Sequence, residues 1–181
     1  MNPQAALDAM TASTDLGPDP VTSFSRDFEF LANPYPCIIW FEDTVYPTAE
    51  HAFHGAKSLD WDERQRIAQI PRWQDAKRAG RALQLRPGWD QLRRAVMLQI
   101  QLCKYTQHPS LYGALVSTGD RLLLEGNWWG DTDWGAVVPG HSKFSPDLPW
   151  WHSGDKVWAG HNWLGTSLMM TRSVLTEVPV T

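Results

Sequence analysis

The segment "YPTAEHAFHGAK", residues 46–57, holds side chains that could perform acid–base chemistry. Thr48 can cap a helix that begins here. Glu50 then lies in the first helical turn, where the helix dipole favours a negative charge by about 0.3–1 kcal/mol. His54 and Lys57 follow four and seven residues later, so the three side chains share one side of the helix. This spacing predicts an ionised carboxylate with a cation beside it, although a solvated polar face with an i,i+4 pair gives the same pattern.

Two histidines of the same segment raise the question of a metal site. His51 and His54 are three residues apart and could in principle share an ion. No third ligand follows at a recognisable spacing, and the HEXXH motif is absent. We therefore expect no bound metal.

A pair of cations occurs in "AKRAGR", residues 76–81. Lys77 and Arg81 are one helical turn apart, and Gly80 between them permits a close approach of the backbone. Such a pair can clamp a phosphate or a pyrophosphate. Solvation at the surface explains the same residues equally well.

The densest polar and aromatic segment is "EGNWWGDTDWG", residues 125–135. It combines Glu125, Asp131 and Asp133 with three tryptophans and several glycines. A loop of this kind can stack a flat ring and hold polar groups against it. A structural turn whose tryptophans fill the core is the equal alternative.

The composition of the 181-residue chain is that of an ordinary globular protein, with 43% hydrophobic and 20% charged residues. The formal net charge of -4 argues against strong non-specific binding to nucleic acid or to anionic lipid. No apolar run approaches the roughly 18 residues that span a bilayer, and no basic segment followed by an apolar run suggests a secretory signal. Two distant cysteines, Cys37 and Cys103, fit a reducing cytoplasm.

The elements that must position these residues are mostly helical. Residues 1–22 are expected to form a mobile leader, and residues 23–181 one domain with a tryptophan- and proline-rich insertion at about 136–160 that we expect to be an irregular loop. Short strands are expected around "CIIWF" and in "RLLLEGN". The fold class is therefore α+β, a single mostly helical domain with a few short strands. Helices are expected at about 48–58, from Asp60 or Asp62 through "ERQRIAQI", from Pro71 through "RWQDAKRAGRAL", at 90–107, in "PSLYGALVSTG" and in "NWLGTSLMMTRSVL".

The clearest helical pattern runs through "DQLRRAVMLQIQLCKYTQ". Leu92, Val96, Ile100 and Cys103 recur at helical spacing and are expected to face the core, with the arginines outside. Asp90 is the expected N-terminal cap. In the final helix, the leucines at 164, 168 and 175 are expected on one side.

Several motifs occur in an order that is known from a protein family. The chain resembles the NADAR family, also called YbiA-like, from about residue 24 to residue 175. The motifs that carry the resemblance are, in chain order, "FLAN" (30–33), "YPTAEHAFHGAK" (46–57), "AKRAGR" (76–81), "RPGWD" (86–90), "TGD" (118–120), "EGNWWGDTDWG" (125–135) and "GHNWLGTSLMMTR" (160–172).

The resemblance implies an N-glycosidase on a compact α+β fold, without a redox cofactor or a catalytic metal. Family members are associated with ADP-ribose attached to guanine bases and with ribosylamino-pyrimidines of early riboflavin synthesis. The implied partner is thus a small nucleotide-ribose or an ADP-ribosylated base, free or within DNA or RNA, and no membrane. The insertion at 136–160 departs from the family pattern and could reshape the rim of a pocket.

The resemblance also implies roles for individual residues. Glu50 matches the essential carboxylate of "P-x-x-E-H", and Asn33 matches the asparagine of "F-L-S-N", with Ala32 in place of serine. Glu50 would stabilise an oxocarbenium-like transition state and activate water. Lys57, Lys77 and Arg81 would receive phosphates. The remaining matches are Asp131, Trp134 and Gly135 in "D-x-x-W-G", and Asn162 in "G-x-N-x-L-G".

Among these, Asp131 is expected to act as the second catalytic group by positioning water or ribose hydroxyls, and Trp134 to stack on the leaving base. Asn33, Gly135 and Asn162 are expected to contribute to substrate binding. The resemblance implies ADP-ribosylated guanine or a related ADP-ribose conjugate as the preferred substrate. A hydrolase of phosphoribosylamino-pyrimidines, a non-catalytic module that binds ADP-ribose, and a nucleic-acid-binding protein remain open.

Overall fold

The structure, a computed structural model, describes residues 19–153 and 156–177. Helices dominate it, with a few short antiparallel strands, which confirms the predicted α+β class. Residues 1–18 of the predicted leader lie outside the described part of the chain. At its end the prediction was wrong, because Val21 is buried and exchanges backbone hydrogen bonds with Leu122 and Leu124, both at 2.8 Å. The elements in chain order are η1 (Arg26–Leu31), β1 (Ile39–Phe41), β2 (Thr44–Tyr46), α2 (Ala49–Gly55), α3 (Trp61–Ala68), α4 (Trp73–Arg81), α5 (Trp89–Thr106), α6 (Pro109–Val116), β3 (Trp150–Ser153), β4 (Lys156–Ala159) and α7 (Trp163–Glu177).

The chain forms two compact units. One, which we call the helical unit, comprises residues 29–117. The other, the split unit, combines residues 19–28 with 118–153 and 156–177. Within the described residues, no helix is both long and apolar enough to cross a membrane.

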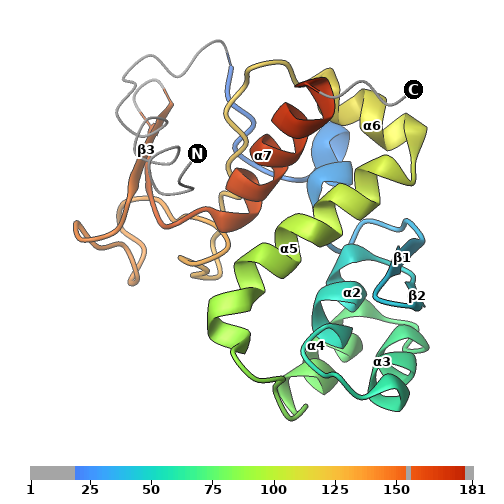
Figure 1. Cartoon of the computed structure of the whole chain (residues 1–181). Helices are drawn as coiled ribbons and strands as arrows, with labels where there is room; N and C mark the ends of the chain where they lie inside the picture. The colour runs from blue at the N-terminus through green and yellow to red at the C-terminus, as the bar shows by residue number, and fades with distance from the viewer. Residues whose placement is uncertain (1–18, 154–155, 178–181) are drawn as a thin grey trace. The chain divides into compact units, whose positions relative to one another are not determined.

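Helix α2 lies at the centre of the helical unit, where it contacts α3, α4, α5 and both strands of the β1–β2 hairpin (Figure 1). All of its residues are buried. Two glycines make this packing close. A Cβ atom on Gly80 of α4 would lie 2.6 Å from Nδ1 of His54, and one on Gly55 would overlap the ring of Tyr46. Residues on α2 are therefore held by neighbours on every side.

The helix starts were predicted in part. Thr48 caps α2, since its Oγ1 accepts a hydrogen bond from the His51 amide at 3.2 Å, and Asp60 caps α3 in the same way at 2.9 Å. The prediction for α4 was wrong by two residues: Pro71 precedes the capping residue and does not lie in the first turn.

The start of α5 also differs from the prediction. Gly88, with a φ of 72°, is the capping residue, and Asp90 lies in the first turn. The prediction chose Asp90 because aspartate commonly caps helices. The backbone at position 88 is left-handed, a conformation that favours glycine, so the helix begins after Gly88.

The buried face of α5 is rotated from the predicted one. Val96 and Ile100 are buried as expected, but Leu92 is 42% exposed and Cys103 is only half-buried. The buried set instead includes polar residues, and it comprises Trp89, Val96, Met97, Ile100, Gln101, Lys104 and Tyr105. Buried polar groups need partners, and those of α5 bind the segment at residues 30–33.

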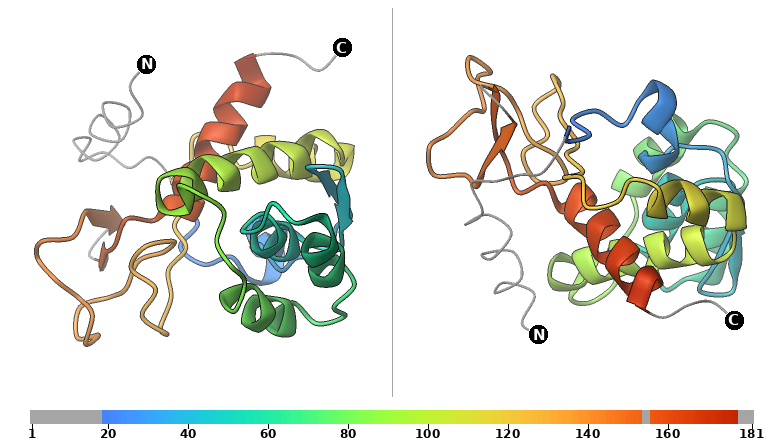
Figure 2. Two further views of the ribbon diagram at one scale, coloured as in Figure 1. Left: turned by 60° about the horizontal axis from the view of Figure 1, so that its bottom comes forward. Right: turned by 90° about the horizontal axis from the view of Figure 1, so that it is seen from above.

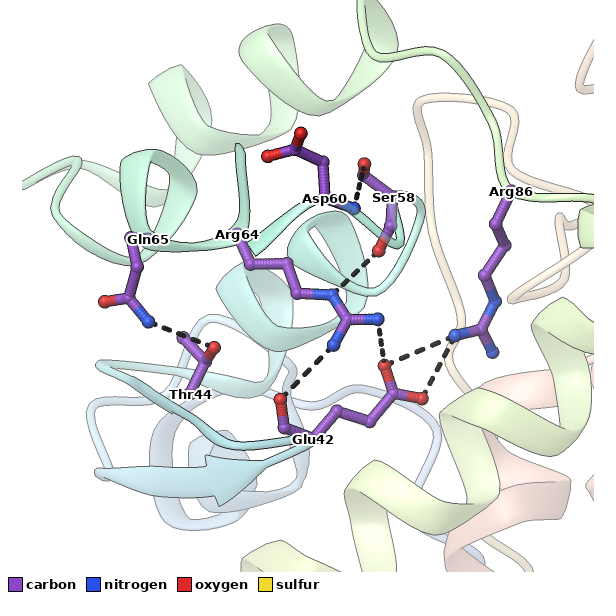
Figure 3. Close-up of polar contacts among 7 residues, drawn as sticks. All are labelled: Glu42, Thr44, Ser58, Asp60, Arg64, Gln65 and Arg86. Carbon is purple, nitrogen blue, oxygen red and sulfur yellow. Dashed lines mark hydrogen bonds and ion pairs between the residues drawn. The ribbon is translucent and has the colours of Figure 1, made fainter. Parts of the chain in front are cut away.

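The turn of the β1–β2 hairpin is fixed by a cluster of ion pairs (Figure 3). The carboxylate of Glu42 lies 2.8 Å from Arg64 of α3 and 3.0 Å from Arg86, which precedes α5. Arg64 also donates from Nε to the Ser58 carbonyl at 2.8 Å. The Arg86 amide donates to the Lys57 carbonyl at 2.7 Å, so this cluster also fixes the end of the α2 segment.

The outer edge of β1 is occupied by a side chain. Gln107, just after α5, accepts a hydrogen bond from the Trp40 amide and donates one to the Trp40 carbonyl, both at 2.9 Å. His108 Nε2 lies 2.6 Å from the Ile38 carbonyl. These contacts tie the hairpin to the C-terminal end of α5.

In the split unit, the prediction of an irregular loop across residues 136–160 was wrong for its second part, whereas residues 138–149 contain no helix or strand, as expected. Strands β3 and β4 pair there as an antiparallel hairpin, with Trp151 opposite Trp158. Figure 2 shows this hairpin, in orange, leading into α7 in red. Trp151 and Trp158 are buried and Trp150 is exposed. Neighbouring side chains of β3 thus alternate between the buried and the exposed face, a strand signal that the proline- and glycine-rich composition of this segment obscured.

Two further predictions concern the split unit. Helix α7 buries Leu164, Leu168 and Leu175, as predicted. The leucines of "RLLLEGN" are buried as expected, but they do not form a regular strand: only Leu123 pairs, in an isolated parallel bridge with Val21.

Candidate functional site

Glu50 is a buried carboxylate whose two oxygens differ. Its side chain is 10% exposed, and Oε1 lies 3.2 Å from His54 Nε2 and 3.4 Å from Lys77 Nζ. Burial would raise the pKa of Glu50, but the hydrogen bond from His54 and the charge of Lys77 outweigh it and hold the pKa below its ordinary value. Oε2 has no partner among the described residues and is not sealed from solvent. Glu50 is thus ionised with one oxygen open to a ligand.

The geometry around His54 assigns its proton. Nδ1 is buried against Gly80 and has no partner among the described residues, so it carries no hydrogen. Nε2 therefore holds the proton and donates it to Glu50. Burial lowers the pKa of His54, against the opposing effect of Glu50, and the charges of Lys57 and Lys77 lower it further. A neutral His54 follows.

His51 serves the helix cap. Its Nε2 lies 3.0 Å from the Ile70 carbonyl, and Nδ1 lies 2.7 Å from Thr48 Oγ1. A carbonyl can only accept, so Nε2 donates to it and Nδ1 accepts from the threonine hydroxyl. Burial lowers the pKa of His51. Both ring nitrogens are engaged, and no group of three or more His, Cys, Asp or Glu that could hold a metal occurs within residues 19–153 and 156–177.

Cations gather near Glu50. Lys57 lies just after α2, with Nζ 5.7 Å from the centre of the Phe53 ring. Burial lowers its pKa to about 8, opposed by Glu50 and aided by the charges of Arg81, Lys77 and Arg93. Lys77 is 40% exposed at its side chain. The three predicted phosphate-binding residues are thus electrostatically linked, since Lys77 and Arg81 lower the pKa of Lys57, and Arg81 is exposed at the end of α4.

Asn33 joins Glu50 through the backbone and α5 through its side chain. Its carbonyl accepts a hydrogen bond from the Glu50 amide at 3.0 Å, and its Oδ1 accepts one from Gln101 Nε2 at 2.7 Å. Lys104 Nζ donates to the Phe30 carbonyl at 2.6 Å and to the Ala32 carbonyl at 3.0 Å. Helix α5 thereby fixes the segment that lies against the start of α2.

Sequence reasoning missed Gln101 and Lys104. Both are fully buried, and the pKa of Lys104 is lowered to about 8 by burial. Lys104 Nζ also lies 5.3 Å and 5.6 Å from the ring centres of Tyr105 and Tyr35. The available signal was that Gln101 follows Met97 and Lys104 follows Ile100 by four residues each, which places both on the face of these apolar residues.

The other predicted site residues lie in the split unit. Asp131 Oδ1 accepts hydrogen bonds from the amides of Asp133 at 3.1 Å and Trp134 at 2.9 Å. Asn127 Oδ1 accepts from the amides of Gly130 and Asp131. These contacts shape the loop at residues 127–135. One oxygen of Asp131 is therefore used structurally.

Asn162 and Gly135 connect neighbouring segments of the same unit. Asn162 is fully buried; Oδ1 accepts from the Glu125 amide and Nδ2 donates to the Leu123 carbonyl, both at 2.9 Å. A Cβ on Gly135 would meet the Glu125 carbonyl and Asn127. Both residues hold backbone in place, and direct contact with a substrate stays an untested prediction for them.

The nine predicted site residues therefore form two groups. Asn33, Glu50, Lys57, Lys77 and Arg81 lie in the helical unit, and Asp131, Trp134, Gly135 and Asn162 lie in the split unit. In the helical unit the structure brings together the Glu50 carboxylate, the Asn33 amide and the cations of the first group, and adds His54, which is hydrogen-bonded to Glu50.

The amino-acid sequence is similar to those of several bacterial and cyanobacterial proteins. The chain is 30% identical over 115 residues to N-glycosidase YbiA of Escherichia coli K12, covering 60% of this chain and 72% of that protein. It is 30% identical over 153 residues to an N-glycosidase of Nostoc punctiforme, covering 77% and 85%. It is 32% identical over 150 residues to a riboflavin biosynthesis protein of Vibrio vulnificus, which covers 82% of this chain but only 36% of that longer protein.

Structural comparison gives the same family. The NMR structure of the E. coli protein YbiA matches with a TM-score of 0.68 and 28% identity, covering 92% of each chain. A family model described as the NADAR domain matches residues 16–176. The resemblance seen in the motifs is confirmed, and the chain belongs to the NADAR domain family.

Proposed function

We propose that this protein is a hydrolase that cleaves the bond between ribose C1′ and a nitrogen atom, with ADP-ribosylated guanine or a related ADP-ribose conjugate as its preferred substrate. The observation that carries the proposal is Glu50: a buried carboxylate, ionised, with Oε1 held by His54 and Lys77 and Oε2 open. The names of the E. coli and Nostoc punctiforme relatives support the same reaction class.

The chemistry follows from the charge that develops during cleavage. As the C1′–N bond breaks, its electron pair leaves with the base and the ribose becomes an oxocarbenium-like cation. An ionised carboxylate beside C1′ stabilises this charge. Glu50 Oε2 can also take a proton from the attacking water, whose oxygen bonds to C1′. The departing nitrogen takes one proton from solvent and Glu50 returns its proton to solvent, so that the net reaction adds one water across the bond.

His54 and Lys77 keep the carboxylate ready for this role. The neutral imidazole donates one hydrogen bond to Oε1 and Lys77 supplies a positive charge, so neither group occupies Oε2. In the proposal, Lys57, Lys77 and Arg81 bind the phosphates, and Asp131 and Trp134 keep the roles expected from their motif.

The decisive test is Glu50→Gln, assayed on ADP-ribosylated guanosine with product detection by mass spectrometry. Glutamine has nearly the same size and can still accept from His54, so the variant is expected to fold. Turnover should fall by about 10²–10⁴-fold because the amide can neither stabilise the cation nor take the proton.

Glu63→Gln is the matched control, since Glu63 also lies in the first turn of a helix, α3. It should leave turnover unchanged. Wild-type turnover in a folded Glu50→Gln protein would show that Glu50 does not act as proposed. Tight binding of ADP-ribose without release of a base would instead favour a non-catalytic module.

A second substrate is favoured by one relative. The Vibrio vulnificus protein bears the name of a riboflavin biosynthesis protein, and this chain matches about a third of it. A phosphoribosylamino-pyrimidine offers the same C1′–N bond and a phosphate for the cations. Assaying both substrates side by side with the wild-type protein separates the two, because the preferred one will show the higher kcat/KM.

A further inference from the structure

Gln101 is a buried amide that contacts the candidate site without belonging to it. It lies on α5, is fully buried, and donates from Nε2 to Asn33 Oδ1 at 2.7 Å. The same nitrogen lies 3.4 Å from the sulfur of Met97. Gln101 therefore acts on Asn33 as a donor.

This contact determines which group of the Asn33 side-chain amide, the oxygen or the NH₂, remains available to a ligand. An amide presents an acceptor oxygen on one side and a donor NH₂ group on the other. Because Oδ1 is bound to Gln101, Nδ2 must point elsewhere. Asn33 is 7% exposed, and its Nδ2 has no partner among the described residues and is not sealed from solvent.

The backbone of Asn33 cannot turn to compensate. Its carbonyl accepts from the Glu50 amide at 3.0 Å. On the preceding side, Lys104 holds the carbonyls of Phe30 and Ala32. Only the side-chain torsions remain, and the hydrogen bond to Gln101 fixes them.

We propose that Gln101 is a positioning residue that orients the Asn33 amide so that its NH₂ group faces the substrate. The substrate atom bound there is then an acceptor, such as a ribose hydroxyl oxygen or a phosphate oxygen. This inference rests on the proposed function, which places the substrate at Glu50.

The orientation complements the carboxylate. Asn33 offers a donor and Glu50 offers an acceptor, Oε2, from two residues whose backbones are hydrogen-bonded to each other. A hydroxyl group can accept from one and donate to the other. A carbonyl oxygen or an aromatic ring nitrogen without a hydrogen can accept from Asn33 but cannot donate to Glu50.

The test is Gln101→Glu, because a carboxylate can accept a hydrogen bond but cannot donate one. Asn33 must then turn its NH₂ group toward residue 101 and present Oδ1 to the substrate. We expect kcat/KM to fall about 10- to 100-fold through a raised KM. Because the new carboxylate is buried, the melting temperature should fall as well, and the kinetics are measured well below it.

Gln107→Glu is the matched control. Gln107 lies just beyond the same helix, and the change removes its hydrogen bond to the Trp40 carbonyl. It should leave kcat/KM at the wild-type value. Gln101→Met, which removes both hydrogen-bonding groups and leaves Asn33 free to turn, should give an intermediate loss and serves if Gln101→Glu does not fold. Wild-type kcat/KM in a folded Gln101→Met protein would overturn the inference, because methionine cannot donate a hydrogen bond to Asn33, whereas a buried glutamic acid that is protonated still can.

A second readout separates this inference from the proposed function. The side-chain NH₂ signals of Asn33 can be identified in a ¹⁵N spectrum by their loss in Asn33→Asp. Saturating ADP-ribose should shift them in the wild-type protein, and this needs no turnover. If no base is released but the signals shift, the proposed function fails and the inference stands; signals that do not shift overturn the inference.

Discussion

At the scale of single residues, two lysines of the helical unit have a pKa of about 8 for related reasons. Burial is the largest cause for both. Lys57 lies among other cations near Glu50, whereas Lys104 is fully buried between carbonyl oxygens and aromatic rings. The charge of Lys57 can therefore serve a ligand, and that of Lys104 serves the fold.

The titration of Lys57 predicts how substrate affinity depends on pH. Below pH 8 the ammonium is charged and can bind a phosphate; as the pH rises through 8, that charge is lost. KM for a phosphate-bearing substrate should therefore rise between pH 7 and 9. The kcat should change little, because Glu50 is ionised throughout this range.

Lys57→Met isolates this effect. Its KM should be raised at pH 7 and should be flat between pH 7 and 9, as measured by initial rates. Lys156→Met, which alters an exposed lysine of the split unit, should keep the wild-type profile. A pH-dependent KM in Lys57→Met would assign the titration to another group.

How far single residues could be predicted depended on the distance of their partners along the chain. Thr48 as a cap and the Glu50–His54 pair follow from spacings of three and four residues, which helix geometry fixes. The bond between Gln101 and Asn33 joins residues 68 positions apart. No local pattern records such a contact, so it required the structure.

At the scale of elements, the contact between α2 and α4 controls the histidine beside Glu50. Gly80 has no side chain, and His54 fills the space that one would take. The sequence suggested that Gly80 allowed a close approach of the backbone, and the structure shows that the approaching group is His54.

Gly80→Ala should therefore damage both stability and activity. The new methyl group would lie 2.6 Å from His54 Nδ1, which forces the ring or the helix to move and disturbs the hydrogen bond to Glu50. We expect a loss of about 1–3 kcal/mol in the free energy of unfolding, as for overpacked cores. Urea denaturation and kcat measure the two effects.

Gly113→Ala supplies the control for helix propensity. Gly113 lies within α6, where an added Cβ meets nothing within 4 Å. This variant should gain up to about 1 kcal/mol because alanine favours a helix more than glycine does. Wild-type stability and activity in Gly80→Ala would contradict the prediction, because they would show that the His54 ring can move away from the new methyl group without loss of free energy.

Elements were predicted well where one pattern was strong and less well where two competed. Helix α7 shows its leucines on one buried side as expected. In α5, the apolar residues Leu92 and Cys103 suggested one face, whereas the buried face contains Gln101 and Lys104. Hydrophobicity alone could not reveal this, because Lys104 and the amide nitrogen of Gln101 are buried with hydrogen bonds to the segment at residues 30–33, whereas Gln101 Oε1 is buried without a partner among the described residues.

At the scale of the whole molecule, Lys104 couples stability to pH. Its pKa is about 8 in the folded chain and 10.5 as an ordinary lysine. Between these values the unfolded chain binds more protons, so stability rises with pH. From pH 8 to 9 this group should contribute a rise of about 1 kcal/mol in the free energy of unfolding.

Lys104→Met should lack this rise. The variant will be less stable overall, because the carbonyls of Phe30 and Ala32 lose their donor. The informative quantity is therefore the change between pH 8 and 9, measured by chemical denaturation in wild type and variant. Other groups titrate equally in both proteins, so an unchanged slope would place the effect elsewhere.

The family could be predicted from the order of short motifs spread over most of the chain, and its confirmation required no single strong motif. The substrate could not be predicted as firmly, since the same cations and carboxylate suit an ADP-ribose conjugate and a phosphoribosyl compound. Discrimination between them depends on groups around the base, for which spacing along the chain gives no rule.

The amide of Gln107 on β1 has a consequence for behaviour in concentrated solution. A short hairpin normally leaves unpaired peptide groups along its border, where another polypeptide can add itself and begin a fibrous assembly. Here the side chain of Gln107 binds both the amide and the carbonyl of Trp40, the two backbone groups with which an added strand would pair. The side chain of Trp40 is 61% exposed, but the backbone groups of Trp40 at this edge are already hydrogen-bonded and cannot pair with another strand.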